Sequence, residues 1–157
     1  MKLRIYLQSP ALGAISRIAN SAASRPFEGA VMVEAIVDPI PGAAWLLFDT
    51  RQSMVGTGNV AVVVAADVGE IKWMDSDPSG RHLAHPVASV ATWPEGERCV
   101  LSVDCFDGAR LHVTAREFGL VLGRSPLSDS PPDLSERPFD HRDDWPDWES
   151  EFEPIVG

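Results

Sequence analysis

Short runs rich in β-branched and aromatic residues, each followed by turn-forming residues, occupy most of the chain after Gly29. Val, Ile, Phe and Trp suit the pleated, half-buried surface of a sheet, and the Pro, Gly and Asp residues between the runs are typical of turns. The pattern therefore predicts a mainly antiparallel sheet. Its expected strands after Gly29 are residues 30–37, 43–48, 60–66, 71–74, 87–93, 99–106 and 110–113.

The first 25 residues predict one more strand and a helix. Residues 2–7 alternate between apolar and polar side chains, which is typical of a half-buried strand. Ser9 is a suitable N-cap and Pro10 suits the first helical position. Apolar residues then follow at helical spacing as far as Arg25, so we expect a helix over residues 9–25 that packs on the sheet.

Residues 99–113 predict a strand with one buried face, followed by a tight hairpin. Cys99 and Cys105 share one face of a strand, six residues and therefore roughly 20 Å apart, so they are expected to be buried thiols and not a disulfide. Ser102 and Asp104 are expected on the opposite, solvated face. Asp107-Gly108 predicts a tight hairpin to the strand at 110–113.

A second helix is predicted directly after this hairpin. Thr114 and Glu117 have the spacing of a capping box, and Gly123 is placed to end the helix. The expected fold class is thus α+β: a curved, mainly antiparallel sheet of about seven to eight strands, an N-terminal helix after the first strand, and a short C-terminal helix. This domain is expected to cover residues 1–123.

Residues 124–157 differ in composition and form a Pro-rich acidic tail. They hold six of the thirteen prolines, ten acidic residues and three basic ones. Such a segment buries too little apolar surface to order by itself, so we expect a tail that is docked on the domain or partly disordered. Its aromatic residues favour docking.

The net charge of −10 argues against direct nucleic-acid binding, because phosphate recognition rests on clustered Lys and Arg. An acidic surface instead suits a basic protein partner. No apolar run reaches the ~20 residues of a membrane helix, and Arg4 interrupts any signal-peptide core. A soluble, cytoplasmic protein with no membrane partner is expected.

Three motifs bear on chemistry, and none predicts a reaction. Gly56-Thr-Gly58-Asn-Val-Ala61 resembles a dinucleotide-binding glycine loop only in outline, because the residues after it favour a strand and not a helix. His82 and His85 lie near Asp75 and Asp77, but the two histidines would point to opposite faces of an extended segment. No serine, cysteine or histidine, His112 included, has the setting of a nucleophile. We therefore expect no catalytic residue, metal or cofactor.

The tail holds the candidate partner-binding residues, in which aromatic and acidic side chains alternate at short intervals. The aromatic side chains either fold back on the domain or anchor the tail in a partner, with the carboxylates meeting Arg or Lys. These residues are Asp143, Asp144, Trp145, Asp147, Trp148, Glu149, Glu151 and Phe152.

Small size, strong acidity and the lack of a catalytic motif favour a non-enzymatic binding protein. The leading hypothesis is a bacterial immunity protein or inhibitor that neutralises one basic toxin or effector enzyme by covering its cleft. The alternatives are an acidic chaperone or adaptor for a secreted partner, or a small ligand-binding or enzymatic domain with a cleft in the curved sheet.

Overall fold

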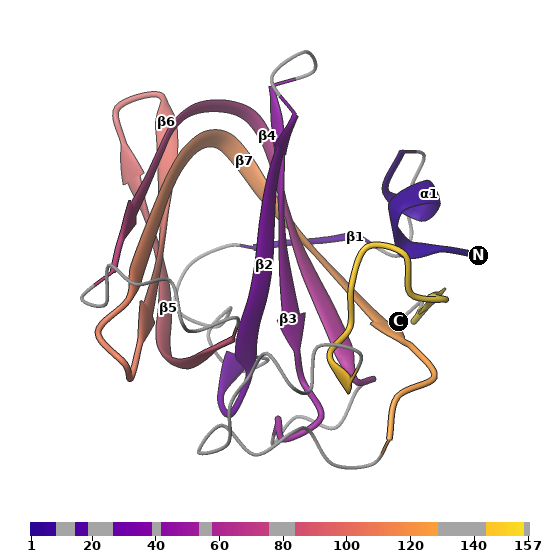
Figure 1. Ribbon diagram of the computed structural model, residues 1–157. Coiled ribbons are helices and arrows are strands. Elements are labelled where there is room, and N and C mark those ends of the chain that lie inside the picture. Colours follow the sequence, from indigo (N-terminus) through magenta and orange to yellow (C-terminus); the bar gives the residue numbers. More distant parts are fainter. Residues whose placement is uncertain are drawn as a thin grey trace.

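A computed structural model describes residues 1–8, 15–18, 27–38, 42–53, 58–75, 84–128 and 144–155 of the protein (Figure 1). This part of the chain contains one short helix, α1, and a sheet of eight strands, β1 to β8. The bounds are α1 Leu3–Gln8, β1 Ile15–Arg17, β2 Val31–Asp38, β3 Ala43–Asp49, β4 Val60–Met74, β5 His85–Glu95, β6 Arg98–Cys105, β7 Arg110–Arg124 and β8 Glu153–Pro154.

All pairings in the sheet are antiparallel, in the order β1-β7-β4-β3-β2-β5-β6, and β8 adds to the end of β7. β7 also pairs with β6, so the sheet curls back toward itself. β2 and β5 share only two residue pairs, at Val31 and Met32, and diverge beyond them (Figure 1). The predicted curved antiparallel sheet is therefore confirmed, although it does not close into a regular barrel.

Both faces of the central strands are covered, and β3 has apolar side chains on each of its two faces. Ala44, Leu46 and Phe48 point to an inner core enclosed by the curled sheet. Trp45 and Leu47 point to the outer face, where a second apolar cluster includes α1 and the C-terminal segment. Because successive side chains of a strand point to opposite faces, a strand covered on both sides reads as a continuous apolar run, as residues 43–48 do.

The strands predicted at 60–66 and 71–74 are one bent strand, β4. Its pairing with β7 shifts by one residue between Val68 and Glu70, which is a β-bulge. Asp67 has a positive φ of 54°, and its backbone oxygen accepts a hydrogen bond of 2.6 Å from the Arg98 guanidinium. The bulge bends β4 and lets β4 and β7 follow the curl of the sheet (Figure 1).

The strand prediction for residues 2–7 is wrong, because Leu3–Gln8 forms α1. Leu3, Tyr6 and Leu7 are buried at helical spacing, whereas Ile5 is 47% exposed. A helix of this length is marginal alone. The first-turn amides of Leu3 and Arg4 donate hydrogen bonds to backbone oxygens of the C-terminal segment, at 2.9 and 2.8 Å, so a distant segment caps the helix.

The helix predicted over residues 9–25 is also contradicted where the chain is described. Ile15–Arg17 forms β1 and pairs with β7 opposite Gly119–Val121, and Ile18 packs against the inner core. Residues 9–14 and 19–25 lie outside the described residues. Pairing along the edge of β7 therefore overrides the local helix signal at this point.

The second predicted helix is wrong as well, because β7 continues without interruption to Arg124. Thr114 and Glu117, expected to cap a helix, pair with β4 opposite Glu70 and Ala66. The ladder with β4 spans nearly the whole length of β7, and this long-range pairing outweighs the capping signal. No C-terminal helix follows in the described residues.

The hairpin at Asp107-Gly108 is confirmed. Gly108 has a φ of 91°, a conformation that glycine adopts without strain. The turn places Cys105 and Ala109 opposite each other, with a hydrogen bond of 2.9 Å from the Cys105 amide. Both cysteines are free thiols, as predicted, but only Cys105 is buried, whereas Cys99 is partly buried. The face that they share points into the inner core.

Two other sequence expectations concern Ser102 and the glycine-containing segment before β4. Ser102, which was expected to be solvent-exposed, is buried on the outer face of β6. That face is therefore not exposed along its whole length. The strands before and after the glycine-containing segment, β3 and β4, pair antiparallel, which confirms the hairpin interpretation. Residues 54–57 of the connection lie outside the described part.

Candidate binding site

The C-terminal segment 144–155, here called the strap, runs along the outer face of the sheet beside α1 (Figure 1). Trp145, Trp148 and Phe152 are buried, and every acidic residue of the strap is exposed. The indole N–H groups of both tryptophans are buried without a hydrogen-bond partner among the described residues. These aromatic side chains therefore hold the strap by packing.

One end of the strap is fixed by Arg51, which lies just after β3. The Arg51 guanidinium donates to both carboxylate oxygens of Asp49, at 3.2 Å to Oδ1 and 2.6 Å to Oδ2, and the two side chains are only 2% and 1% exposed. It also donates to the backbone oxygen of Asp144 at 2.7 Å and lies 5.9 Å from the ring centre of Trp145. One buried guanidinium thus forms hydrogen bonds both to the sheet, at Asp49, and to the strap, at Asp144.

The other end of the strap closes over the end of β7. The Asn59 side chain accepts from the Ser125 amide and donates to the Ser125 carbonyl, both at 2.8 Å. The Ser125 hydroxyl in turn donates to the backbone oxygen of Glu151 at 2.5 Å. Phe152 lies over Gly123 and contacts Tyr6 of α1, with ring centres 5.3 Å apart.

Ion pairs join the strap to the N-terminal residues. Glu149 binds Lys2 at 3.2 Å and Arg4 at 2.6 Å, and Glu151 binds the Met1 ammonium at 2.7 Å. Hydrogen bonds from Lys2 and then Arg4 lower the pKa of Glu149 below its usual value. Likewise, the hydrogen bond from the terminal ammonium lowers the pKa of Glu151. All of these groups are exposed, so each pair contributes little by itself.

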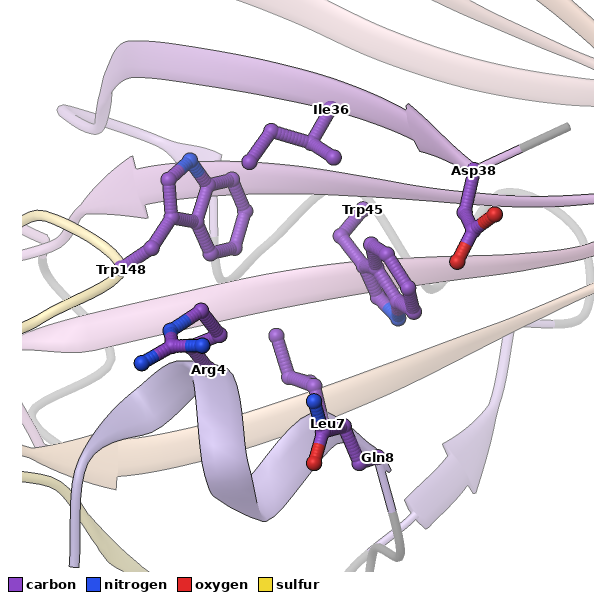
Figure 2. A pocket seen from close by; sticks show the side chains of 7 residues that line it. All are labelled: Arg4, Leu7, Gln8, Ile36, Asp38, Trp45 and Trp148. Carbon is purple, nitrogen blue, oxygen red and sulfur yellow. The ribbon is translucent and has the colours of Figure 1, made fainter.

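A pocket of about 230 Å³ lies between α1, the strands β2 and β3, and the strap (Figure 2). The indoles of Trp45 and Trp148 line it, the Asp38 carboxylate stands beside Trp45, and the Arg4 guanidinium stands on the α1 side. Aromatic walls with charged groups at the edge form a typical small binding site. The complete lining is Arg4, Leu7, Gln8, Ile36, Asp38, Trp45 and Trp148.

The structure separates the sequence-predicted site residues into two groups. Asp144, Asp147, Glu149 and Glu151 are exposed along the strap, whereas Trp145, Trp148 and Phe152 are buried; Asp143 lies outside the described residues. Of these sequence-predicted residues, only Trp148 lines the pocket. Sequence reasoning missed Trp45 and Asp38, for which the available signal was weak: a large aromatic side chain at an outward position of the strand at 43–48, and an acid at a strand end.

The structure gives little support for chemistry at the other candidate residues, the histidines and the cysteines. Nδ1 of His85 lies 2.7 Å from Oδ2 of Asp107, and the His85 ring meets Trp73 edge-on with centres 5.0 Å apart. Burial, followed by the charge of Asp107, raises the pKa of the nearby Cys105 thiol to about 12, so this thiol is not a nucleophile at neutral pH. The described residues include no cluster suited to a metal ion, and His82 and Asp77 lie outside them.

Comparison with known proteins adds no functional assignment. No protein-family model matches the sequence, and no curated protein matches it. Among solved structures, the chain is similar to the crystal structure of an uncharacterized protein from Neisseria gonorrhoeae, with 13% sequence identity and a TM-score of 0.45, over 68% of this chain and 95% of that chain. A similarity this weak supports no inference about the site.

In its described residues the chain is a mainly antiparallel sheet domain with one short N-terminal helix. An acidic strap lies on the outer face of the sheet, and a small pocket lined by two tryptophans lies between the strap, α1, β2 and β3. Within the described residues, no helix has the length and apolar character that crossing a membrane requires.

Proposed function

We propose that this protein is a non-enzymatic protein-binding domain that neutralises one basic partner, a toxin or effector enzyme, in the manner of an immunity protein. The observation that supports this most is the arrangement of the strap, whose five acidic side chains are all exposed while its three large aromatic side chains are buried. The segment that carries these acidic side chains is thus ordered before any partner arrives, and such pre-organisation lowers the entropic cost of binding.

The ion pairs between the strap and the N-terminal residues are compatible with such a role. Exposed pairs such as those of Glu149 contribute little to stability, because solvent screens them. A basic partner that offers Arg or Lys in better geometry can therefore replace them at little cost. Asp147 is held more firmly, because its carboxylate accepts from the backbone amide of Glu149 at 2.8 Å, so it is a fixed negative charge on the strap surface.

The proposal is tested by association kinetics with a partner captured from the host. Charge reversal on the strap, Asp147→Lys with Glu153→Lys, is compared with a matched reversal at the end of the β5–β6 hairpin, Glu95→Lys with Glu97→Lys. All four side chains are exposed, and both double variants change the net charge equally.

If the strap meets a basic partner, the strap variant slows association more than the control does, and added salt slows association of the wild type. A partner whose association rate responds neither to salt nor to the strap reversal contradicts the proposal.

A second candidate function, binding of a small ligand, is favoured by the pocket between α1 and the strap. Its volume of about 230 Å³ is below the ~300–1,000 Å³ of sites for drug-sized molecules. Such a function would therefore concern a small metabolite. A thermal-shift screen of small metabolites, repeated on a Trp45→Leu variant, separates this function from protein binding.

A further inference from the structure

The pocket beside the strap has the chemistry of a site for a single organic cation. Trp45 comes from β3 and Trp148 from the strap, so two indole rings line one small cavity (Figure 2). The faces of indole rings attract ammonium and guanidinium groups more strongly than those of the other aromatic side chains. The pocket walls therefore favour a cation over an anion of the same size.

The charged groups at the pocket support the same preference. The Asp38 carboxylate, at the end of β2, points to the Trp45 side of the pocket (Figure 2). On the α1 side the Arg4 guanidinium is bound by Glu149 at 2.6 Å, and the same carboxylate also binds Lys2. The charge of Arg4 is thus paired with that of Glu149 at the pocket edge. The Asp38 carboxylate lies next to the indole of Trp45.

We infer that this pocket receives the side chain of one lysine or arginine from the basic partner. The choice of a protein side chain as occupant rests on the proposed function, whereas the preference for a cation rests on Trp45, Trp148 and Asp38. The pocket is of a size for one such side chain and lies directly beside the acidic strap. It would act as the anchor of the interface, and the exposed acids would guide the approach.

The test uses the full chain and simple probes, and it needs no partner. The indole N–H signals of the protein are followed by NMR during titration with n-butylammonium chloride and with n-butylguanidinium chloride. Sodium butyrate and n-butanol, at constant ionic strength, serve as an anion and a neutral molecule of similar size. The two cations are expected to give saturable shifts of the Trp45 and Trp148 signals, with affinities about three- to tenfold higher than that of n-butanol.

Two matched variants locate the effect. Asp38→Asn is expected to weaken n-butylammonium binding about three- to tenfold, while Glu34→Gln, an exposed acid on the same strand, leaves it unchanged. Trp45→Phe is expected to weaken binding, and Trp93→Phe, on β5 outside the pocket lining, is not.

Absence of saturable shifts, equal binding of butyrate or n-butanol, or an equal response of Asp38→Asn and Glu34→Gln overturns the inference. Any of these results leaves the salt and charge-reversal test of the strap untouched. Cation binding in the pocket together with a salt-indifferent partner would instead contradict the proposed function and keep the cation site.

Discussion

Phe152 occupies the space in which any side chain at position 123 would lie: a Cβ on Gly123 would come within 2.1 Å of the Phe152 ring and 2.8 Å of the Glu153 carbonyl oxygen. Gly123 was expected to end a helix, and it instead lets the strap close over the end of β7. A residue without a side chain is needed because strap and strand approach so closely.

Gly123→Ala is therefore expected to destabilise the protein by about 1–3 kcal/mol, because the added methyl group overpacks the contact with Phe152. The measurement is the midpoint of chemical denaturation, made also in a Phe152→Ala background. There the cost of Gly123→Ala should fall, since the ring that blocks the methyl group is gone. Strictly additive costs in this double-mutant cycle would contradict the contact.

Arg51→Met is expected to cost about 3–5 kcal/mol, because it leaves the Asp49 carboxylate buried and unpaired. Arg51→Lys should recover only part of this, since lysine cannot reproduce the double contact with Asp49. The matched control is Arg116→Met, which removes an exposed pair with Glu117 and should cost less than about 1 kcal/mol. Similar losses for Arg51→Met and Arg116→Met in urea denaturation would refute the role of Arg51.

Acidification is expected to weaken the attachment of the strap to the N-terminal residues. The pKa of Glu149 in the folded protein lies below its ordinary value of 4.5, so its contribution is present above pH 4.5 and is lost as the pH falls through the lowered pKa. Glu149→Gln should flatten this part of the stability–pH profile. Glu117→Gln, on β7, serves as the control. An unchanged profile for Glu149→Gln would show that the pairs with Lys2 and Arg4 do not form in solution.

The two cysteines should differ in reactivity. Cys105 is buried with a pKa near 12, so almost none of it is thiolate at pH 8, whereas Cys99 is only partly buried. Alkylation followed by mass spectrometry should label Cys99 first and Cys105 only after unfolding. Equal labelling rates in the folded protein would show that the Cys105 end of β6 opens readily; a Cys99→Ser variant isolates the Cys105 rate.

The candidate site was only partly accessible from the sequence. The alternation of acids and aromatic residues in the tail identified Trp148 and Glu149, because it lies within a few neighbouring residues. The pocket combines Arg4 and Leu7 from α1, Asp38 from β2, Trp45 from β3 and Trp148 from the strap. No local pattern links residues so far apart, so their meeting depends on how the sheet is ordered and on where the strap lies.

Local preference and period-2 alternation are enough to predict most of the sheet: the β-rich runs from residue 30 onward, the inward face of Cys99 and Cys105, and the hairpin at Asp107-Gly108. By contrast, α1, β1 and the length of β7 depend on contacts between segments that are distant in the sequence. Leu3–Gln8 is helical because the strap caps it and buries Tyr6, and residues 114–123 are extended because β4 offers a long ladder to pair with. Local propensities differ by only ~1 kcal/mol or less per residue, so several hydrogen bonds and buried side chains supplied from far along the chain reverse them.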